Sequence, residues 1–473
     1  MTLEIPNDLA IALEAAGQAH LLGSWDGLNE GSRRNLLSAL RALDLPQIQK
    51  LGEHLRKPME HEAQSFEAPI TFPLDRTDEQ LTHAQKAIDL GESLLSESKV
   101  GFVLVAGGQG SRLGFDGPKG MVPVGPVSGL SLFGWHAARL TAAKQRFGMR
   151  ITWFVMTSAT NNGATRAFFE EQKFFGLGSE NVHFFTQEML PALDQEGRIV
   201  RTAPDQLFLA PNGHGGTLQA LRSEGMLDLA ASLGIEQFSY FQVDNPLVRP
   251  ADPLFIGLHA MAGADMSSKV VTKNEPGEKV GVLGLADGKL GCIEYSDLPE
   301  SLRQERDPDG QLRFRAGNIA VHMIRRDFAE QLTQDGQLDL PWHLARKNLK
   351  GIDAEGQVAE IPGVKFETFV FDALGAAANS VTLEVRRDEE FAPVKNAEGS
   401  DSPASCRLAL TESFGRMFEA AGHPLPERNA DGTLPIEVDP RAAENADEFC
   451  AWIDHLLELQ RPTTPTENGW LYR

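Results

Sequence analysis

From about residue 98 onward, hydrophobic residues gather in short runs separated by amphipathic stretches. The runs are rich in β-branched and aromatic residues and cover residues 99–105, 151–156, 182–185 and 238–243. Runs of this length and composition predict buried β-strands. Apolar residues recur at helical spacing between them, over residues 132–147, 164–175 and 216–234. This alternation predicts an α/β fold, with a mainly parallel, Rossmann-like sheet that carries helices on both faces.

The two ends of the chain have a different pattern. Residues 1–97 have mostly helical spacing, interrupted by an extended, proline-containing stretch over 68–77. Beyond about residue 380 the alternation weakens, and a last helix is predicted over 446–460. We therefore predict three parts, which are an N-terminal helical region (1–97), a central α/β domain (98–380) and a small C-terminal domain (381–473).

A glycine-rich segment directly follows the first predicted strand. It contains Gly107, Gly108 and Gly110, and it is followed by Arg112 and Lys119. Glycines let the backbone approach a ligand and turn its N–H groups toward an anion. Arginine adds a planar fork for phosphate oxygens and lysine a mobile point charge. Ligands of such sheets bind beyond the carboxyl ends of the strands, which predicts a phosphate site here.

Two familiar phosphate motifs do not fit this segment. A dinucleotide fingerprint requires G-x-G-x-x-G, but counted from Gly108 the last position falls on Leu113. A Walker loop requires Ser or Thr after Gly-Lys, whereas Gly120 follows Lys119. A tight turn with unrelated charges is the alternative without function. The strand, the arginine and the Pro-Lys-Gly triplet together disfavour it.

The overall charge makes these cations stand out. The chain has 44 Lys and Arg against 66 Asp and Glu, a formal net charge of −22. Such a surface repels polyanions, so nucleic acid and anionic membranes are not expected partners. The 3 cysteines are far apart, and the N-terminus resembles no signal peptide. No apolar run approaches the ~20 residues of a membrane helix. We expect a cytoplasmic protein, and the sequence does not indicate its oligomeric state.

At this point the sequence resembles a known family. GGQGSRLG followed by PKG resembles the eukaryotic-type UDP-sugar pyrophosphorylases, and within that family the UDP-N-acetylhexosamine branch. The resemblance continues in chain order over roughly residues 10–400, through YFQVDNPLVRPADPLFIG, AGNIAVH and RRDEEFAPVKNA. It implies that the central part is a nucleotidyltransferase domain. The residues beyond about 400 match poorly, and nothing is transferred to them.

The resemblance implies a set of nucleotide-binding residues. In the family the glycine loop encloses the nucleotide phosphates and approaches the uracil, which corresponds here to Gly107, Gly108 and Gly110. Gln187, in FFTQEMLPAL, resembles the glutamine that reads the uracil edge, and an amide carries the donor and acceptor for this. Without the resemblance it would be interpreted as a loop residue. Gly213, in APNGHGG, resembles a uracil-contacting glycine that opens a helix.

The resemblance also implies the charged residues of the reaction. Arg112, Lys119 and Lys395 correspond to catalytic residues that offset phosphate charge, with Lys395 on the sugar 1-phosphate. Asp244 corresponds to the ligand of Mg²⁺, the implied cofactor. From the residues alone, Asp244-Asn245 is equally well explained as a turn after a strand. A carboxylate there can hold Mg²⁺ while phosphate oxygens and waters complete the octahedron.

Four residues correspond to sugar-binding positions, namely His214, Gly281, Glu294 and Asn318. His214 departs from the N-acetylhexosamine enzymes, which usually have Asn there, whereas UDP-glucose enzymes have His. The choice of sugar therefore stays open between N-acetylglucosamine 1-phosphate, which the overall resemblance favours, and glucose 1-phosphate or a broad range.

The implied activity joins UTP to a sugar 1-phosphate and releases pyrophosphate and a UDP-sugar. We expect direct displacement, because phosphate is already ionised at neutral pH and no Ser-His-Asp or Cys-His constellation is evident. A catalytically silent nucleotide-sugar sensor is the non-enzyme alternative. A nicotinamide dehydrogenase is disfavoured by the glycine spacing.

Overall fold

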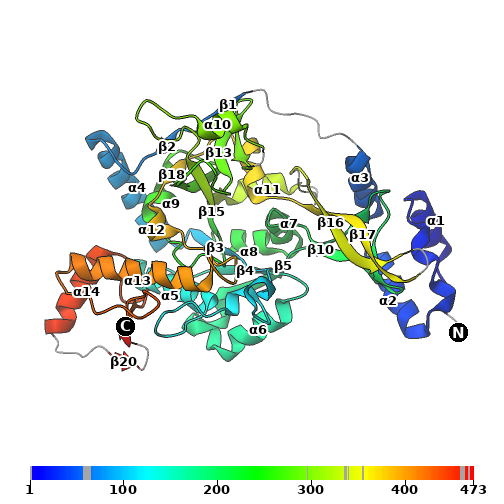
Figure 1. The fold of residues 1–473 in the computed structure, drawn as a ribbon, viewed down its shortest axis with the longest axis horizontal. Coiled ribbons are helices and arrows are strands. Elements are labelled where there is room, and N and C mark those ends of the chain that lie inside the picture. Colours follow the sequence, from blue (N-terminus) through cyan, green and yellow to red (C-terminus); the bar gives the residue numbers. More distant parts are fainter. Residues whose placement is uncertain are drawn as a thin grey trace. The chain divides into compact units, whose positions relative to one another are not determined.

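A computed structural model describes residues 3–56, 65–295, 297–334, 338, 340–353, 356–458, 464–466 and 469–472. The chain forms two compact units (Figure 1). Unit 1 comprises Met1–Gln64, Glu188–Gly216 and Leu340–Val370. Unit 2 comprises Ser65–Gln187, Thr217–Asp339 and Phe371–Arg473. The three predicted parts remain a prediction, and the units divide the chain differently, since two internal segments group with the N-terminal residues.

Unit 2 is built around a sheet of eleven strands. Its main path runs β2, β18, β12, β15, β11, β3, β4, β5. The strands of this path are β2 (Thr71–Phe72), β3 (Val100–Val105), β4 (Trp153–Thr157), β5 (Val182–Thr186), β11 (Gln237–Gln242), β12 (Met266–Thr272), β15 (Ala316–Arg325) and β18 (Thr382–Glu384). Strands β11, β3, β4 and β5 are the four predicted runs and pair in parallel. The predicted α/β fold with a mostly parallel sheet is confirmed.

Strand β15 runs opposite to its two neighbours. It pairs antiparallel with β11 on one side and β12 on the other. Periodicity reports which residues are buried but not strand direction, so the sequence did not predict this strand's orientation. Because β15 is antiparallel, its first residues lie at the edge of the sheet where β3 and β11 end. A hairpin of β13 (Val282–Ala286) and β14 (Lys289–Ile293) joins it there, and β1 (Phe66–Glu67) pairs with β13.

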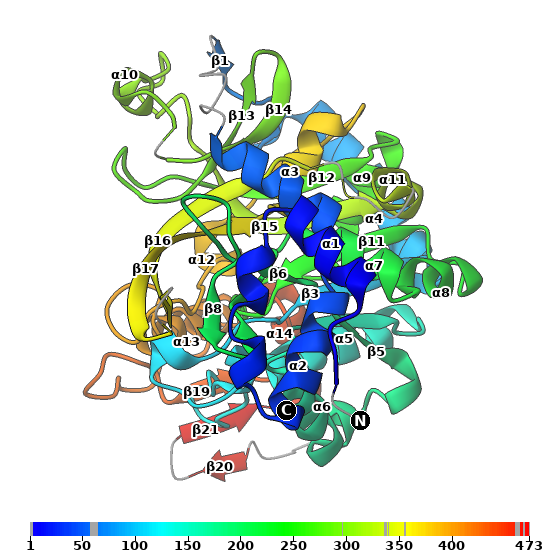
Figure 2. The same ribbon diagram turned by 90° about the vertical axis from the view of Figure 1, so that its right-hand side faces the viewer.

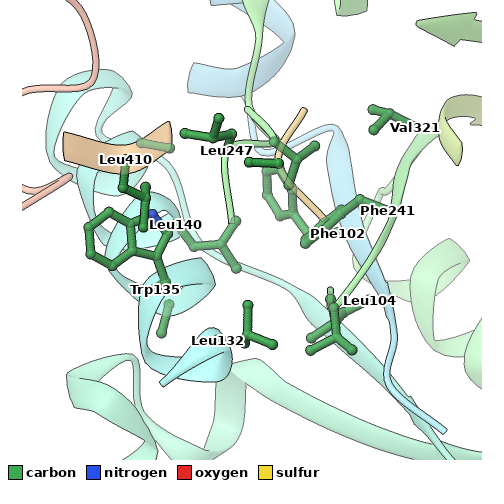
Figure 3. Close-up of a cluster of buried hydrophobic side chains, with 14 of the residues drawn as sticks. Phe102, Leu104, Leu132, Trp135, Leu140, Phe241, Leu247, Val321 and Leu410 are labelled. Atoms are coloured by element: carbon green, nitrogen blue, oxygen red, sulfur yellow. The ribbon is translucent and has the colours of Figure 1, made fainter. Parts of the chain in front are cut away.

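Helices cover both faces of this sheet. One face carries Phe102, Leu104 and Phe241, which are buried in a core shared with α5 (Leu132–Phe147) (Figure 3). On the opposite face the Tyr240 hydroxyl bonds Thr217 of α7 (Gly216–Ser223). Burial raises the pKa of Tyr240 there. Further helices of this unit are α4 (Asp78–Ser96), α6 (Asn162–Glu171), α8 (Met226–Ser232), α9 (Pro253–Met261), α10 (Glu300–Gln304) and α11 (Arg326–Leu332).

The helix boundaries follow local signals. Helix α5 has the predicted bounds because Ser131 Oγ accepts a hydrogen bond from Gly134 N (3.1 Å) and Gly148 ends the helix at φ 65°. The predicted helix over 216–234 is instead two helices, α7 and α8, separated at Gly225 with φ 72°. A glycine with this φ stops a helix that apolar spacing alone would continue.

The C-terminal residues of unit 2 pack onto the same core as α5. Trp135 of α5 lies against Phe414 of α13 (Pro403–Ala420), with ring centroids 6.2 Å apart. Helix α14 (Ala446–Glu458) corresponds to the last predicted helix, and its Phe449 is buried in this core. A small sheet is formed by β19 (Ile436–Val438), β21 (Gly469–Tyr472) and β20 (Thr464–Thr466). The short helix α12 (Arg387–Glu390) precedes this region.

Unit 1 has its own hydrophobic core. The predicted N-terminal helices α1 (Asn7–Ala15), α2 (Glu30–Arg41) and α3 (Leu45–Arg56) are drawn in dark blue in Figure 2. Their apolar residues, such as Leu36 and Leu51, cluster with Leu193 and Phe366 from the strands. The strands are β6 (Met189–Pro191), β7 (Leu193–Asp194), β8 (Arg201–Ala203), β9 (Gln206–Leu207), β10 (Leu209–Pro211), β16 (His343–Ile352) and β17 (Val358–Glu367). Among the described residues of the chain, none forms a helix of the length and apolar character that a bilayer span requires.

Candidate active site

The glycine loop after β3 is held by a network of main-chain bonds. Gly110 N donates to Gly117 O (2.8 Å), and Lys119 N donates to Gly108 O (3.1 Å). The fully buried Asn161 donates from Nδ2 to Ala106 O (2.8 Å) and to Gly108 O (3.3 Å). The loop is therefore closed on itself and fastened to Asn161, which lies between β4 and α6.

Gln187 lies directly against this loop. Its backbone N donates to Thr157 O (2.9 Å), which continues the pairing of β4 with β5. A Cβ atom added at Gly107 would be 2.5 Å from Gln187 Nε2. Only glycine fits at this position while the buried Gln187 side chain keeps its place. Two predicted nucleotide-binding residues, distant in sequence, are thus brought together.

Lys119 and Asp244 form an ion pair at the carboxyl edge of the sheet. Lys119 Nζ is 3.4 Å from Asp244 Oδ2, and the two side chains are 21% and 11% exposed. Asp244 comes just after β11, whose continuation Val243 donates to Val105 O (3.1 Å) at the end of β3. The pair therefore stands where β3 and β11 end side by side.

The segment that carries Lys395 is attached to the same turn. Val394 N donates to Asp244 O (2.9 Å). The buried Asn245 donates from Nδ2 to Glu390 O (2.7 Å) and accepts at Oδ1 from Ala392 N (3.1 Å). Lys395 itself is exposed, with its Nζ 5.6 Å above the Phe391 ring. Asn245 thus holds together the stretches that bear Asp244 and Lys395.

A fully buried lysine, paired with two carboxylates, lies behind this segment. Lys269 Nζ is 2.7 Å from Asp252 Oδ2 and 2.6 Å from Glu390 Oε2. Burial opposes the charge of Lys269, but the two carboxylates outweigh it and raise its pKa. Glu390 is the residue whose carbonyl oxygen Asn245 binds, so this cluster fixes the start of the segment leading to Lys395.

Arg112 is the predicted catalytic residue with the fewest restraints. It lies in the 3-10 turn Ser111–Leu113 and its side chain is exposed. It forms no ion pair with any described residue of the chain. Arg112 follows the glycine loop in sequence, and among the described residues its guanidinium forms neither a hydrogen bond nor an ion pair with Lys119 or Asp244.

The predicted sugar-binding residues of unit 2 are brought together at the start of β15. Asn318 N donates to Gly281 O (2.9 Å), and Asn318 Oδ1 accepts from Ala320 N (3.0 Å). A Cβ atom added at Gly281 would be 3.5 Å from Glu294 Oε1 and 2.7 Å from Cys292 Sγ. Burial raises the pKa of the Cys292 thiol. Because β15 is antiparallel, this group lies at the edge of the sheet where β11 ends and Asp244 follows.

Gly213 and His214 belong to unit 1. Gly213 has φ 84°, and a Cβ atom added there would be 2.4 Å from Thr368 O. His214 Nδ1 accepts a hydrogen bond from Val370 N (3.2 Å), and its ring stacks on Phe369 at 5.1 Å. The Phe369 ring in turn stacks on His343 at 4.2 Å. The backbone turn and the imidazole are both firmly oriented within this unit.

Some residues of this arrangement were missed from the sequence. Asn161 and Asn245 orient the glycine loop and the Asp244 turn, while Phe369 and His343 stack beneath His214. Asn245 follows Asp244 directly, which was the one available signal. The others act through contacts between residues far apart in sequence, which spacing does not indicate.

The donor set can be tested for a metal ion. Among the described residues, no group of three or more His, Cys, Asp or Glu side chains converges as in a protein cage for a metal. Asp244 is a single carboxylate beside a phosphate-type loop. This set suits Mg²⁺, which is commonly held by one or two carboxylates together with substrate phosphates and water.

A mostly parallel sheet with a glycine loop, a lysine and an aspartate at its carboxyl edge defines an α/β nucleotidyltransferase. Comparison with known proteins agrees. The family described as UTP--glucose-1-phosphate uridylyltransferase matches residues 62–440, and the chain belongs to this family. The resemblance stated from the motifs is confirmed.

Individual relatives match over nearly the whole chain. UDP-N-acetylhexosamine pyrophosphorylase-like protein 1 of Homo sapiens is 37% identical over 467 residues, covering 92% of this chain and 90% of the relative. UDP-N-acetylglucosamine diphosphorylase 2 of Arabidopsis thaliana is 35% identical over 461 residues, covering 93% and 90%. The crystal structure of the uridine diphosphate N-acetylglucosamine pyrophosphorylase from Trypanosoma brucei, in complex with an inhibitor, has a TM-score of 0.79 at 27% identity, covering 100% of this chain and 99% of that chain.

Proposed function

We propose that this chain transfers the uridylyl group of UTP to N-acetylglucosamine 1-phosphate, releasing pyrophosphate and UDP-N-acetylglucosamine. Its activity is that of a sugar-1-phosphate uridylyltransferase of the UDP-N-acetylglucosamine pyrophosphorylase type. The observation that carries the residue assignment is the Lys119–Asp244 pair, 3.4 Å apart and bonded through Asp244 O to the segment of Lys395.

The chemistry is a direct displacement at phosphorus. A phosphate oxygen of the sugar 1-phosphate forms a bond to the α-phosphorus of UTP while the bond to the bridging oxygen of pyrophosphate breaks. Negative charge grows on the departing pyrophosphate, and catalysis consists of alignment and charge stabilisation. In this proposal Lys119 offsets charge near the reacting phosphorus, Lys395 offsets charge on the sugar phosphate, and Arg112 offsets charge on pyrophosphate. No proton has to move and no enzyme nucleophile is required.

Mg²⁺ is the proposed cofactor, and Asp244 would hold it. When bound, the ion neutralises phosphate oxygens of the two substrates. Asp244 also pairs with Lys119, so the residue that would hold the ion and the proposed catalytic lysine lie side by side.

In this proposal, residues around Gly107 select the nucleotide and residues around Gly281 select the sugar. Gln187 carries an amide against Gly107 and is suited to the uracil edge. Glu294 and Asn318, gathered around Gly281, can bond sugar hydroxyls or an acetamido group. The roles of Gly213 and His214 toward uracil and sugar stay predictions. His214 favours glucose 1-phosphate as a second candidate substrate, because UDP-glucose enzymes resemble the chain at this position.

The displacement mechanism has a direct test. The purified chain is incubated with UTP and Mg²⁺, with and without N-acetylglucosamine 1-phosphate, and is followed by intact-protein mass spectrometry and product analysis. We expect UDP-N-acetylglucosamine only when both substrates are present, and a protein mass unchanged throughout. A uridylylated protein formed from UTP alone would contradict direct displacement.

A further inference from the structure

The C-terminal residues, for which the sequence suggested no role, contribute two carboxylates to the support of the candidate active site, the buried Glu437 and the partly buried Glu444. Glu437 of β19 is 1% exposed, and its Oε2 accepts hydrogen bonds from Val127 N (2.8 Å) and Ser128 N (2.9 Å). Glu444 Oε1 accepts from Arg139 Nη1 (2.8 Å). Both contacts join residues about three hundred positions apart in sequence.

The loop bound by Glu437 leads directly from Lys119. Val122 N donates to Lys119 O (3.0 Å), and Leu132 N donates back to Val122 O (3.0 Å), so residues 122–132 form a closed loop. The carboxylate fills the middle of this loop. A Cβ atom added at Gly125 would be 3.1 Å from Glu437 Oε2. The position of the loop, and with it the turn that carries Lys119, is therefore set against β19.

The second carboxylate reaches the turn that carries Asp244. Arg139 of α5 is almost fully buried and also donates from Nε to Pro246 O (2.9 Å), two residues beyond Asp244. Burial lowers the pKa of Arg139 and raises the pKa of Glu444, and the charge of each group opposes this effect on the other. Arg249 and Glu389 also act on this pair, since Arg249 repels Arg139 and attracts both Glu444 and Glu389.

These contacts are an inefficient way to stabilise the fold. A buried carboxylate costs several kcal/mol of desolvation, and a well-packed apolar side chain would serve stability equally well. Glu437 has no ion-pair partner in the described part of the chain, so its charge is held by two amides. Charge-assisted hydrogen bonds are short and directional, and this suits a contact that fixes loop geometry.

We propose that residues 436–444 form a positioning element for catalysis, in which Glu437 orients the loop of Lys119 and Glu444, through Arg139, orients the turn of Asp244. Glu437 and Glu444 are positioning residues, because neither contacts the proposed reacting groups. The inference rests on the proposed function of Lys119 and Asp244. A displacement of a catalytic group by about 1 Å can lower turnover by roughly a hundredfold.

The experiment compares Glu437→Ala, Glu437→Gln and Glu444→Ala with Lys119→Ala and with the double variant Lys119→Ala/Glu437→Ala. Glu427→Ala is the matched control, because Glu427 is an exposed acid of the same region that forms no hydrogen bond to either segment in the described part of the chain. Turnover in UDP-sugar synthesis is divided by the folded fraction, measured by near-ultraviolet circular dichroism. Assays are run well below the unfolding midpoint of every variant, so that lost stability alone does not lower the rate.

We expect Glu437→Ala and Glu444→Ala to lower kcat per folded molecule by at least tenfold, with KM for UTP changed less than threefold. Glu437→Gln, which keeps an acceptor oxygen, should recover part of the loss. If Glu437 acts through Lys119, the double variant should be no slower than Lys119→Ala alone. Glu427→Ala should match the unmodified chain.

Several results would overturn the inference. If Glu437→Ala folds less stably but each folded molecule turns over at the original rate, the contact is only structural. The inference also fails if Glu437→Ala lowers kcat by the same factor in the Lys119→Ala variant as it does in the unmodified chain. If Glu437→Ala does not fold, Glu437→Gln and Glu444→Ala decide in the same way. Unchanged turnover in Lys119→Ala would instead remove the proposed function of that lysine, and the inference with it.

Discussion

At the scale of single residues, a close steric constraint in the glycine loop joins Gly107 to Gln187. Because an added Cβ would be 2.5 Å from Gln187 Nε2, Gly107→Ala must displace that amide. We predict that Gly107→Ala raises KM for UTP at least tenfold and weakens discrimination between UTP and CTP, because the amide is proposed to read the uracil edge.

Steady-state kinetics with both nucleotides check this prediction. Gly163→Ala is the matched control, since an added Cβ there meets nothing within 4 Å. Unchanged selectivity in Gly107→Ala would show that Gln187 does not recognise the base.

The second prediction concerns the ion pair. Lys119→Ala and Asp244→Ala should each lower kcat by roughly a hundredfold or more, because each removes charge stabilisation aimed at the transferred phosphoryl group. Neither should unfold the chain, since both side chains lie at the edge of the sheet and remain partly exposed. Turnover is measured beside thermal unfolding, with the exposed Lys144→Ala as control. Full activity in either variant would discredit its assignment.

The third prediction concerns sugar choice. His214→Asn introduces the residue usual in the N-acetylhexosamine enzymes, so it should raise the ratio of kcat/KM for N-acetylglucosamine 1-phosphate over glucose 1-phosphate. The imidazole is oriented by Val370 N and Phe369, which an asparagine would reproduce only in part. Competition assays give the ratio directly, and an unchanged ratio would count against contact between His214 and the sugar.

At the scale of elements, the packing of α5 on β11 has a pH-dependent consequence. His136 of α5 is fully buried, with Nε2 3.1 Å from Val243 O, and burial lowers the pKa of His136 to about 4. The unfolded chain therefore binds this proton more readily than the folded one between pH 6.5 and 4. Its stabilising contribution is present above pH 6.5 and is lost as the pH falls toward 4.

We predict that the unfolding midpoint falls between pH 6.5 and 4, and that His136→Asn shows a shallower fall. Thermal unfolding followed by circular dichroism across this range compares the slopes. The absolute stability of His136→Asn is not decisive, because only the dependence on pH reports the proton. Equal slopes in the two proteins would mean that His136 is not the group concerned.

Much of the central architecture could be predicted from hydrophobic runs. The four parallel strands and α5 follow from local length, composition and capping, since a run such as 99–105 is buried on both faces. The direction of β15 could not be predicted, because burial looks the same in either direction. The break at Gly225 was missed for a related reason, since apolar spacing continues across it.

The residues of the candidate site also divide into those that the sequence predicts and those that it does not. The glycine loop, Lys119 and Asp244 could be identified because each follows a strand directly, and parallel strands bring their carboxyl ends to one edge. Residues such as Asn161 and Glu437 could not be identified. Their importance lies in hydrogen bonds to backbone atoms that are distant in sequence, and an isolated Asn or Glu carries no signal of such a bond.

At the scale of the whole molecule, the distribution of charge distinguishes between nucleic acid and small phosphorylated molecules as partners. A net charge of −22 repels nucleic acid, yet Lys119, Lys395 and Arg112 all belong to loops at or near the carboxyl edge of one sheet. A local group of cations attracts a small phosphate compound at short range, even though the rest of the surface is acidic. The distribution therefore fits small phosphorylated substrates, as UTP and a sugar 1-phosphate are.

The most direct measurement of the central claim is pyrophosphate release from UTP with a panel of sugar 1-phosphates, with Mg²⁺ and after its removal by a chelator. The account predicts release with N-acetylglucosamine 1-phosphate at the highest kcat/KM, slower release with glucose 1-phosphate, and loss of activity on chelation that added Mg²⁺ restores. Absence of pyrophosphate release with every sugar at saturating Mg²⁺ would contradict it and would favour a silent nucleotide-sugar sensor.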